Sequence, residues 1–67
     1  MKPQDKIYVA GHAGLVGSAV ARALAREGYG NVVVRTRAEL DLTDAQAVAH
    51  FFASETPRFV FLAAARV

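Results

Sequence analysis

Apolar positions along the chain follow two spacings that alternate, and each change of spacing marks the edge of a predicted element. Short runs of β-branched and aromatic residues predict strands at residues 6–10, 31–35 and 59–65. From 14 to 27 the apolar side chains recur every three or four residues, as in an amphipathic helix. A second helix, ending near Glu55, has an apolar face made of Ala45, Val48, Phe51 and Phe52.

Local signals predict where these helices begin and end. Gly28 occupies the usual glycine position after the first helix, and Pro57 stops the second. Thr43 and Gln46 have the spacing of a capping box at the start of the second helix. Residues 37–42 are predicted to be mostly loop, with a stunted strand near their end as the alternative. The order of elements predicts an α/β fold with a parallel sheet and right-handed crossovers.

Composition narrows the possible classes of protein. The chain has 67 residues, is 54% hydrophobic and carries a net charge of +2, which describes one small folded domain with no excess charge for nucleic acid or a membrane. It has no cysteine, so disulfides, cysteine-bound zinc and a thiol nucleophile are excluded. Two isolated histidines make no metal site. No signal peptide or membrane-length apolar run is present, and a cytoplasmic location is the default expectation.

Three glycines, Gly11, Gly14 and Gly17, fall where the first strand turns into the first helix. In a dinucleotide-binding turn the first glycine allows the tight turn, the second lets the backbone approach a pyrophosphate, and the third lets helix and strand pack closely. The helix N-terminus then offers free amides to the phosphates. The alternative is a flexible loop with a helix–strand contact. The position between this strand and this helix favours dinucleotide binding.

The spacing of these glycines resembles the fingerprint of the extended short-chain dehydrogenases, the NAD-dependent epimerase/dehydratase family of nucleotide-sugar enzymes. The resemblance implies that residues 1–67 are the N-terminal part of a Rossmann fold, a doubly wound parallel sheet of three strands, truncated before the catalytic region. It places the third strand on the opposite side of the first from the second. The cofactor contacts that it implies are Gly11, His12, Ala13, Gly14, Leu15, Val16, Gly17, Ala63, Ala64 and Ala65.

Three stretches taken together resemble one branch of that family more closely: residues 9–12 with Gly14 and 16–19; residues 35–37 with 39–40 and Leu42; and residues 51–55 followed by 62–65. Enzymes of this branch convert GDP-4-keto-6-deoxy-mannose by epimerisation at C3 and C5, followed by reduction at C4 with NADPH. The resemblance implies NADP(H) as cofactor and, in a full-length parent, a GDP-sugar substrate and a homodimer. It implies no nucleic-acid or membrane partner.

The end of the second predicted strand indicates the cofactor. An acidic residue there binds the ribose hydroxyls of NAD, whereas arginine accommodates the 2′-phosphate of NADP. At this position the chain has Arg35 and Arg37 and no acidic residue. These arginines favour binding of NADP over the alternative that they belong to a solvated basic loop without a ligand. By the resemblance, Arg37 is the better match to the phosphate-binding arginine, and Asp41 and Leu42 would lie along the adenine. Ala13 stands where the family commonly has a second phosphate-binding arginine.

The chain has no catalytic pair of the short-chain dehydrogenase type, Tyr-x-x-x-Lys. His12 follows Tyr8 by four residues, and Val33 follows Tyr29. The 67 residues alone are therefore predicted to be inactive, with Tyr8 in the core. Three alternatives stay open: a segment of another extended dehydrogenase, a stand-alone nucleotide-binding module, and a fragment without function.

Overall fold

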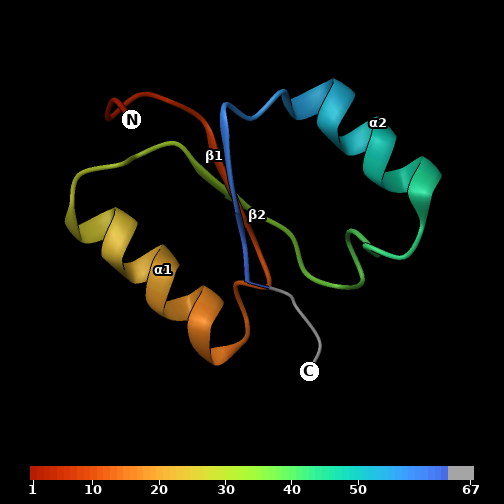
Figure 1. Cartoon of the computed structure of the whole chain (residues 1–67), viewed down its shortest axis with the longest axis horizontal. Coiled ribbons are helices and arrows are strands. Elements are labelled where there is room, and N and C mark those ends of the chain that lie inside the picture. Colours follow the sequence, from red (N-terminus) through yellow and green to blue (C-terminus); the bar gives the residue numbers. More distant parts are fainter. Residues whose placement is uncertain (64–67) are drawn as a thin grey trace.

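The computed structural model describes residues 1–63, which form three parallel strands and two helices (Figure 1). The elements follow the order β1 (Ile7–Ala10), α1 (Leu15–Arg26), β2 (Val32–Val34), α2 (Ala45–Glu55) and β3 (Phe59–Leu62). The sheet order is β2-β1-β3, and Ile7 of β1 stands opposite Val32 on one side and Phe59 on the other. The predicted α/β architecture and the predicted side of the third strand are confirmed. Ala64 and Ala65 lie outside the described residues.

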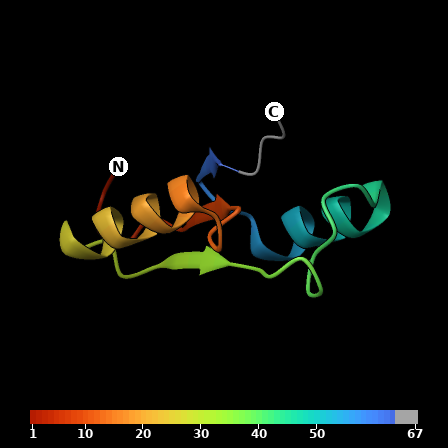
Figure 2. The same cartoon turned by 90° about the horizontal axis from the view of Figure 1, so that it is seen from below.

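β1 is buried from end to end because a helix covers each of its faces. Ile7 and Val9 pack against Leu24 of α1, while Tyr8 and Ala10 pack with Leu40 and Phe51 on the α2 side. The strands therefore run between the two helices in Figure 1, and the helices lie at opposite ends of the molecule in Figure 2. This arrangement explains why the first strand is apolar at every position, without polar alternation.

α2 begins one residue later than its predicted capping box requires. The N-cap is Asp44, whose side chain accepts a hydrogen bond of 3.1 Å from the amide of Ala47. Thr43, predicted to be the cap, instead donates its hydroxyl to the Asp41 carboxylate at 2.7 Å. The prediction is wrong because two carboxylates accept the hydrogen bonds involved. The Asp44 carboxylate accepts from the helix amide that the Thr43 hydroxyl was expected to bind, and the Thr43 hydroxyl donates to the Asp41 carboxylate.

The other boundaries follow the predictions closely. α1 begins after Gly14 and is followed by Gly28, whose φ of 90° is one that glycine adopts without strain. Residues 37–42 contain no strand and form the predicted loop. β2 and β3 are the edges of the described sheet. Within residues 1–63, no helix is both long and apolar enough to cross a membrane.

Candidate functional site

The turn between β1 and α1 is held together by its own backbone. Gly11 has a φ of 82°, which favours glycine, and its carbonyl accepts a hydrogen bond of 3.1 Å from the amide of Gly14. A Cβ on Gly17 would overlap the carbonyl group of Gly11 and lie 3.0 Å from the amide nitrogen of His12. The close helix–strand approach predicted for the third glycine is therefore confirmed.

Gly14 differs from Gly11 and Gly17 because no contact within residues 1–63 requires a glycine there. Its φ of −78° suits any residue, and a Cβ would meet only the Gly11 oxygen, at an ordinary 3.5 Å. Gly14 is exposed at the start of α1. The residue's lack of a side chain thus leaves open space above the turn, where a ligand could approach the backbone.

The N-terminus of α1 is open, in contrast to that of α2. α1 has no side-chain cap and no acidic residue in its first turn, whereas Asp44 caps α2. The first amides of α1 are therefore available to an acceptor from outside the chain, and the helix dipole favours a negative one. Leu15 and Val16 in this first turn are exposed, at 87% and 63%.

A pocket of about 290 Å³ lies at the carboxyl ends of β1 and β2. Its walls come from the glycine turn and from the loop between β2 and α2. Seven predicted site residues line it: Gly11, His12, Ala13, Arg35, Arg37, Asp41 and Leu42. The remaining predicted residues of the turn, from Gly14 to Gly17, start α1 beside the pocket. Ala63 lies next to the turn, with its amide donating to the Ala10 carbonyl at 3.0 Å.

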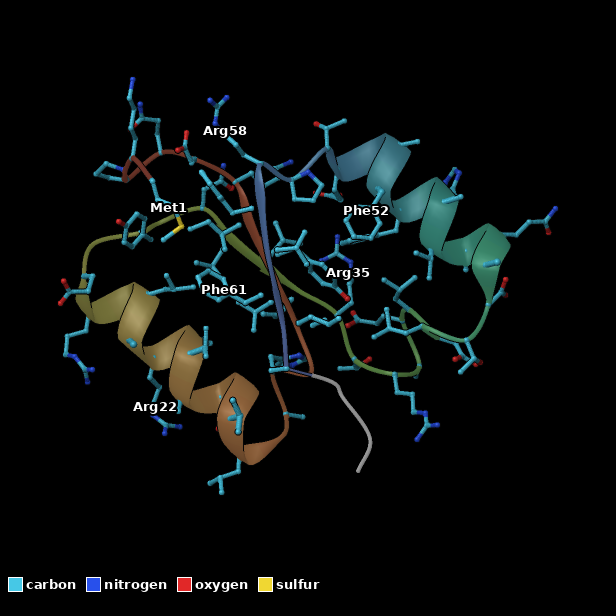
Figure 3. All side chains as sticks on the ribbon, in the orientation of Figure 1. Met1, Arg22, Arg35, Phe52, Arg58 and Phe61 are labelled. Carbon is cyan, nitrogen blue, oxygen red and sulfur yellow. The ribbon has the colours of Figure 1, made fainter. Side chains whose placement is uncertain are left out.

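The two arginines after β2 are not equivalent. Arg35 donates to the Val34 carbonyl at 2.8 Å and to the Glu55 carboxylate at 3.3 Å, and its guanidinium carbon lies 5.3 Å from the centre of the Phe51 ring. Figure 3 shows it at the centre of the molecule, on the α2 side of the sheet. Arg37 is exposed and makes no hydrogen bond or ion pair with other residues in the 1–63 range. Arg37 is thus the arginine with a guanidinium available for a ligand.

The loop that carries Arg37 is fixed by two carboxylates. Glu39 accepts a hydrogen bond of 2.7 Å from the Thr36 amide, and Asp41 accepts one of 2.9 Å from the Thr43 amide. The Thr36 amide and hydroxyl lower the pKa of Glu39, and the Thr43 hydroxyl and amide lower that of Asp41. The acidic residues of the loop are therefore engaged in holding its shape.

Sequence reasoning missed four residues that line the pocket: Tyr8, Thr36, Leu40 and Thr43. A signal existed for Thr36, because Thr36 and Glu39 have the capping-box spacing that was assigned instead to Thr43 and Gln46. Tyr8 lies in the core as predicted, and burial raises the pKa of its hydroxyl. Within the described residues, no group of histidines and carboxylates could hold a metal ion.

Comparison with known proteins places this pocket in context. A family model described as "NAD dependent epimerase/dehydratase family" matches residues 7–67. A putative GDP-L-fucose synthase 2 of Oryza sativa subsp. japonica is 63% identical over 62 residues, which cover 92% of this chain and 18% of that protein. The GDP-L-fucose synthase of Escherichia coli K12 is 50% identical over 64 residues, covering 96% and 20%. The chain spans about a fifth of the length of the curated relatives it matches.

Solved structures give the same picture of the fold. A GDP-mannoheptose C4 reductase from Campylobacter jejuni with NADP bound has a TM-score of 0.97 and 48% identity, covering 100% of this chain and 21% of its own. A GDP-6-OMe-4-keto-L-xylo-heptose reductase from the same organism also has a TM-score of 0.97 and 48% identity, covering 100% and 19%.

Proposed function

Since the chain belongs to the NAD dependent epimerase/dehydratase family, we propose that it is the cofactor-binding part of an NADP-dependent enzyme that makes GDP-L-fucose. This enzyme epimerises GDP-4-keto-6-deoxy-mannose at C3 and C5 and reduces it at C4. One observation carries the proposal: the glycine turn and the Arg37 loop form the two walls of one pocket at the carboxyl ends of β1 and β2. That edge is where doubly wound sheets bind nucleotides.

The pocket and the residues beside it offer a contact for each part of the adenosine half of NADP. Gly14, where the missing Cβ leaves room, and the first amides of α1 would hold the pyrophosphate, which the amides would bind as donors. The exposed guanidinium of Arg37 binds the 2′-phosphate through charge-assisted hydrogen bonds. Asp41 and Leu42 lie along the adenine. Ala63 would contact the ribose, in keeping with the family resemblance, which also implies contacts by Ala64 and Ala65, outside the described residues.

The chemistry of the reaction is supplied in part by the cofactor and in part by the remainder of the enzyme. NADPH provides the hydride that reduces the C4 carbonyl. The residues of this chain bind and orient the cofactor, because the chain has no Tyr-x-x-x-Lys pair to move the proton. Two solved GDP-heptose enzymes, one with NADP bound and one in the presence of NADPH, support the choice of cofactor.

A second candidate is a reductase of another GDP-sugar. Two GDP-heptose reductases are 48% identical to this chain, whereas four plant proteins named GDP-L-fucose synthases are 56–63% identical. The higher identity of these four favours the fucose branch. We also propose that the full-length enzyme is cytoplasmic and forms a homodimer. Light scattering coupled to size-exclusion chromatography tests the oligomeric state.

The decisive experiment supplies the full-length protein with NADPH and either GDP-4-keto-6-deoxy-mannose or a GDP-4-keto-heptose. We expect loss of NADPH absorbance with the first substrate and GDP-L-fucose as the product identified by NMR. Turnover of the heptose alone would favour the second candidate. If the protein binds NADPH but neither sugar causes NADPH oxidation, the proposed reduction of a GDP-sugar is wrong.

A further inference from the structure

We propose that Glu39 is a positioning residue for the 2′-phosphate site. Its hydrogen bonds stabilise the turn of residues 36–39 after β2, and this conformation places Arg37 at the pocket. This inference rests on the proposed binding of NADP. Glu39 does not itself line the pocket that contains Arg37. It lines a separate hollow on the α2 side, together with His50 and Glu55, and so acts only through the turn.

The turn is closed by reciprocal hydrogen bonds between its first and last residues. The Thr36 amide donates to Glu39 Oε1 at 2.7 Å, and the Glu39 amide donates to Thr36 Oγ1 at 3.2 Å. The Leu40 amide also donates to the Thr36 carbonyl, at 2.9 Å. This is the pattern of a capping box, here closing a single turn in which Arg37 is the first residue after the cap.

The next residue anchors the turn to the core. Leu40 is 7% exposed and packs with Tyr8 and Phe51, between the sheet and α2. The backbone on both sides of Arg37 is thus fixed, by Thr36 before it and by Glu39 and Leu40 after it. A fixed backbone leaves only the rotamers of the Arg37 side chain to be ordered when a phosphate binds, which lowers the entropic cost of binding.

Charge and geometry predict opposite effects for one substitution. The carboxylate of Glu39 is negative and lies two residues from Arg37, so its charge alone opposes a phosphate. Its hydrogen bond with the Thr36 amide favours the turn. Glu39→Gln removes the charge and keeps an oxygen that can accept from Thr36, whereas Glu39→Ala removes both.

The test measures binding of 2′,5′-ADP and 5′-AMP to the full-length protein by calorimetry, because the two probes differ only in the 2′-phosphate. We expect Glu39→Ala to weaken 2′,5′-ADP by about three- to tenfold and to leave 5′-AMP unchanged. Glu39→Gln should bind 2′,5′-ADP at least as well as the wild type. In an Arg37→Ala background, Glu39→Ala should have no further effect, since the two residues act in series.

The outcomes separate this inference from the function on which it rests. If Glu39→Ala leaves the affinity for 2′,5′-ADP unchanged while Arg37→Ala lowers it, the positioning role is wrong and the 2′-phosphate site stands. If Arg37→Ala changes nothing, the NADP assignment fails as well. Loss of both probes together in Glu39→Ala would mean general damage to the pocket and would also overturn the inference. Should that variant not fold, Glu39→Asp, which keeps the charge but shortens the side chain that reaches the Thr36 amide, gives the same comparison.

Discussion

Arg35 and Glu55 are joined by an ion pair of 3.3 Å that ties the end of β2 to the last residue of α2. Lys6, at the start of β1, approaches the same carboxylate at 3.2 Å. The charge of Arg35 is therefore balanced inside the protein, and its guanidinium also lies against the Phe51 ring. Arg37 has no such partner within residues 1–63 and carries the proposed contact with the cofactor phosphate.

Arg37→Ala should weaken NADPH far more than NADH in the full-length protein. Losing a charge-assisted contact costs about 1.5–3 kcal/mol, or roughly ten- to a hundredfold in affinity. Fluorescence titration with each cofactor measures the effect. The matched control is Arg35→Ala, which removes the neighbouring guanidinium. It should lower the unfolding free energy by about 0.5–1 kcal/mol, since the pair is partly exposed, and leave the NADPH-to-NADH ratio unchanged.

Two outcomes would contradict this division between the arginines. Equal weakening of both cofactors by Arg37→Ala would remove the 2′-phosphate assignment. A fall in the NADPH-to-NADH ratio caused by Arg35→Ala would show that Arg35 leaves Glu55 and takes part in phosphate binding.

Gly14→Val and Gly17→Ala should fail in different ways. A Cβ at Gly14 would meet only the Gly11 carbonyl oxygen, at 3.5 Å, but the side chain fills the space proposed for the pyrophosphate, so cofactor binding should be lost while the protein still folds. A single methyl group at Gly17 meets the Gly11 backbone and should destabilise the fold by about 1–3 kcal/mol. Thermal unfolding and NADPH titration of both variants separate the two effects. Wild-type affinity in folded Gly14→Val would rule out a pyrophosphate at this turn.

The hydrophobic spacing predicted all five elements, because the buried faces of β1, α1 and α2 dominate their sequences. The side of β1 on which β3 pairs came from the family resemblance and not from the spacing. The glycine turn was also predictable, because only glycine satisfies the positive φ at Gly11 and the close backbone approach at Gly17, and both glycines are visible in the sequence. The loop from 36 to 43 was not. Threonine and acidic residues can form a cap at several positions there, and local sequence does not decide which carboxylate pairs with which hydroxyl. The capture of Arg35 by Glu55 depends on a contact across 20 residues, which no local pattern reveals.

Stability should fall in mild acid through the loop carboxylates. Thr36 lowers the pKa of Glu39 below its ordinary 4.5, and Thr43 lowers the pKa of Asp41 below its ordinary 3.8. The folded chain therefore binds fewer protons than the unfolded chain near these values. The stabilisation is complete above the ordinary pKa values and is lost as the pH falls through the lowered ones.

Thermal unfolding of the full-length protein, measured from neutral pH to below the ordinary pKa values of Glu39 and Asp41, checks the effect. The double variant Glu39→Gln, Asp41→Asn should lose part of the acid dependence. Glu27→Gln, a change at an exposed glutamate just after α1, should follow the wild type. An acid dependence that is identical in all three proteins would show that these carboxylates do not contribute.

The 67-residue chain produced by itself should self-associate and remain inactive. β3 is an edge of the described sheet, and its Val60 and Leu62 side chains are 46% and 73% exposed. Exposed apolar edges pair with other chains, so analytical ultracentrifugation should show aggregates that Leu62→Lys reduces. NADPH oxidation with GDP-4-keto-6-deoxy-mannose should be absent. A monomer with a sharp, reversible thermal transition would contradict the first expectation, and sugar-dependent NADPH oxidation the second.

The residues that line the pocket fall between Tyr8 and Thr43, on β1 and on the two loops that follow β1 and β2. Under the proposed function, this part of the chain binds the adenosine half of the cofactor together with Ala63, and it makes no contact with the sugar. Enzymes that act on different GDP-sugars can therefore share this cofactor pocket and differ in the residues that bind the sugar.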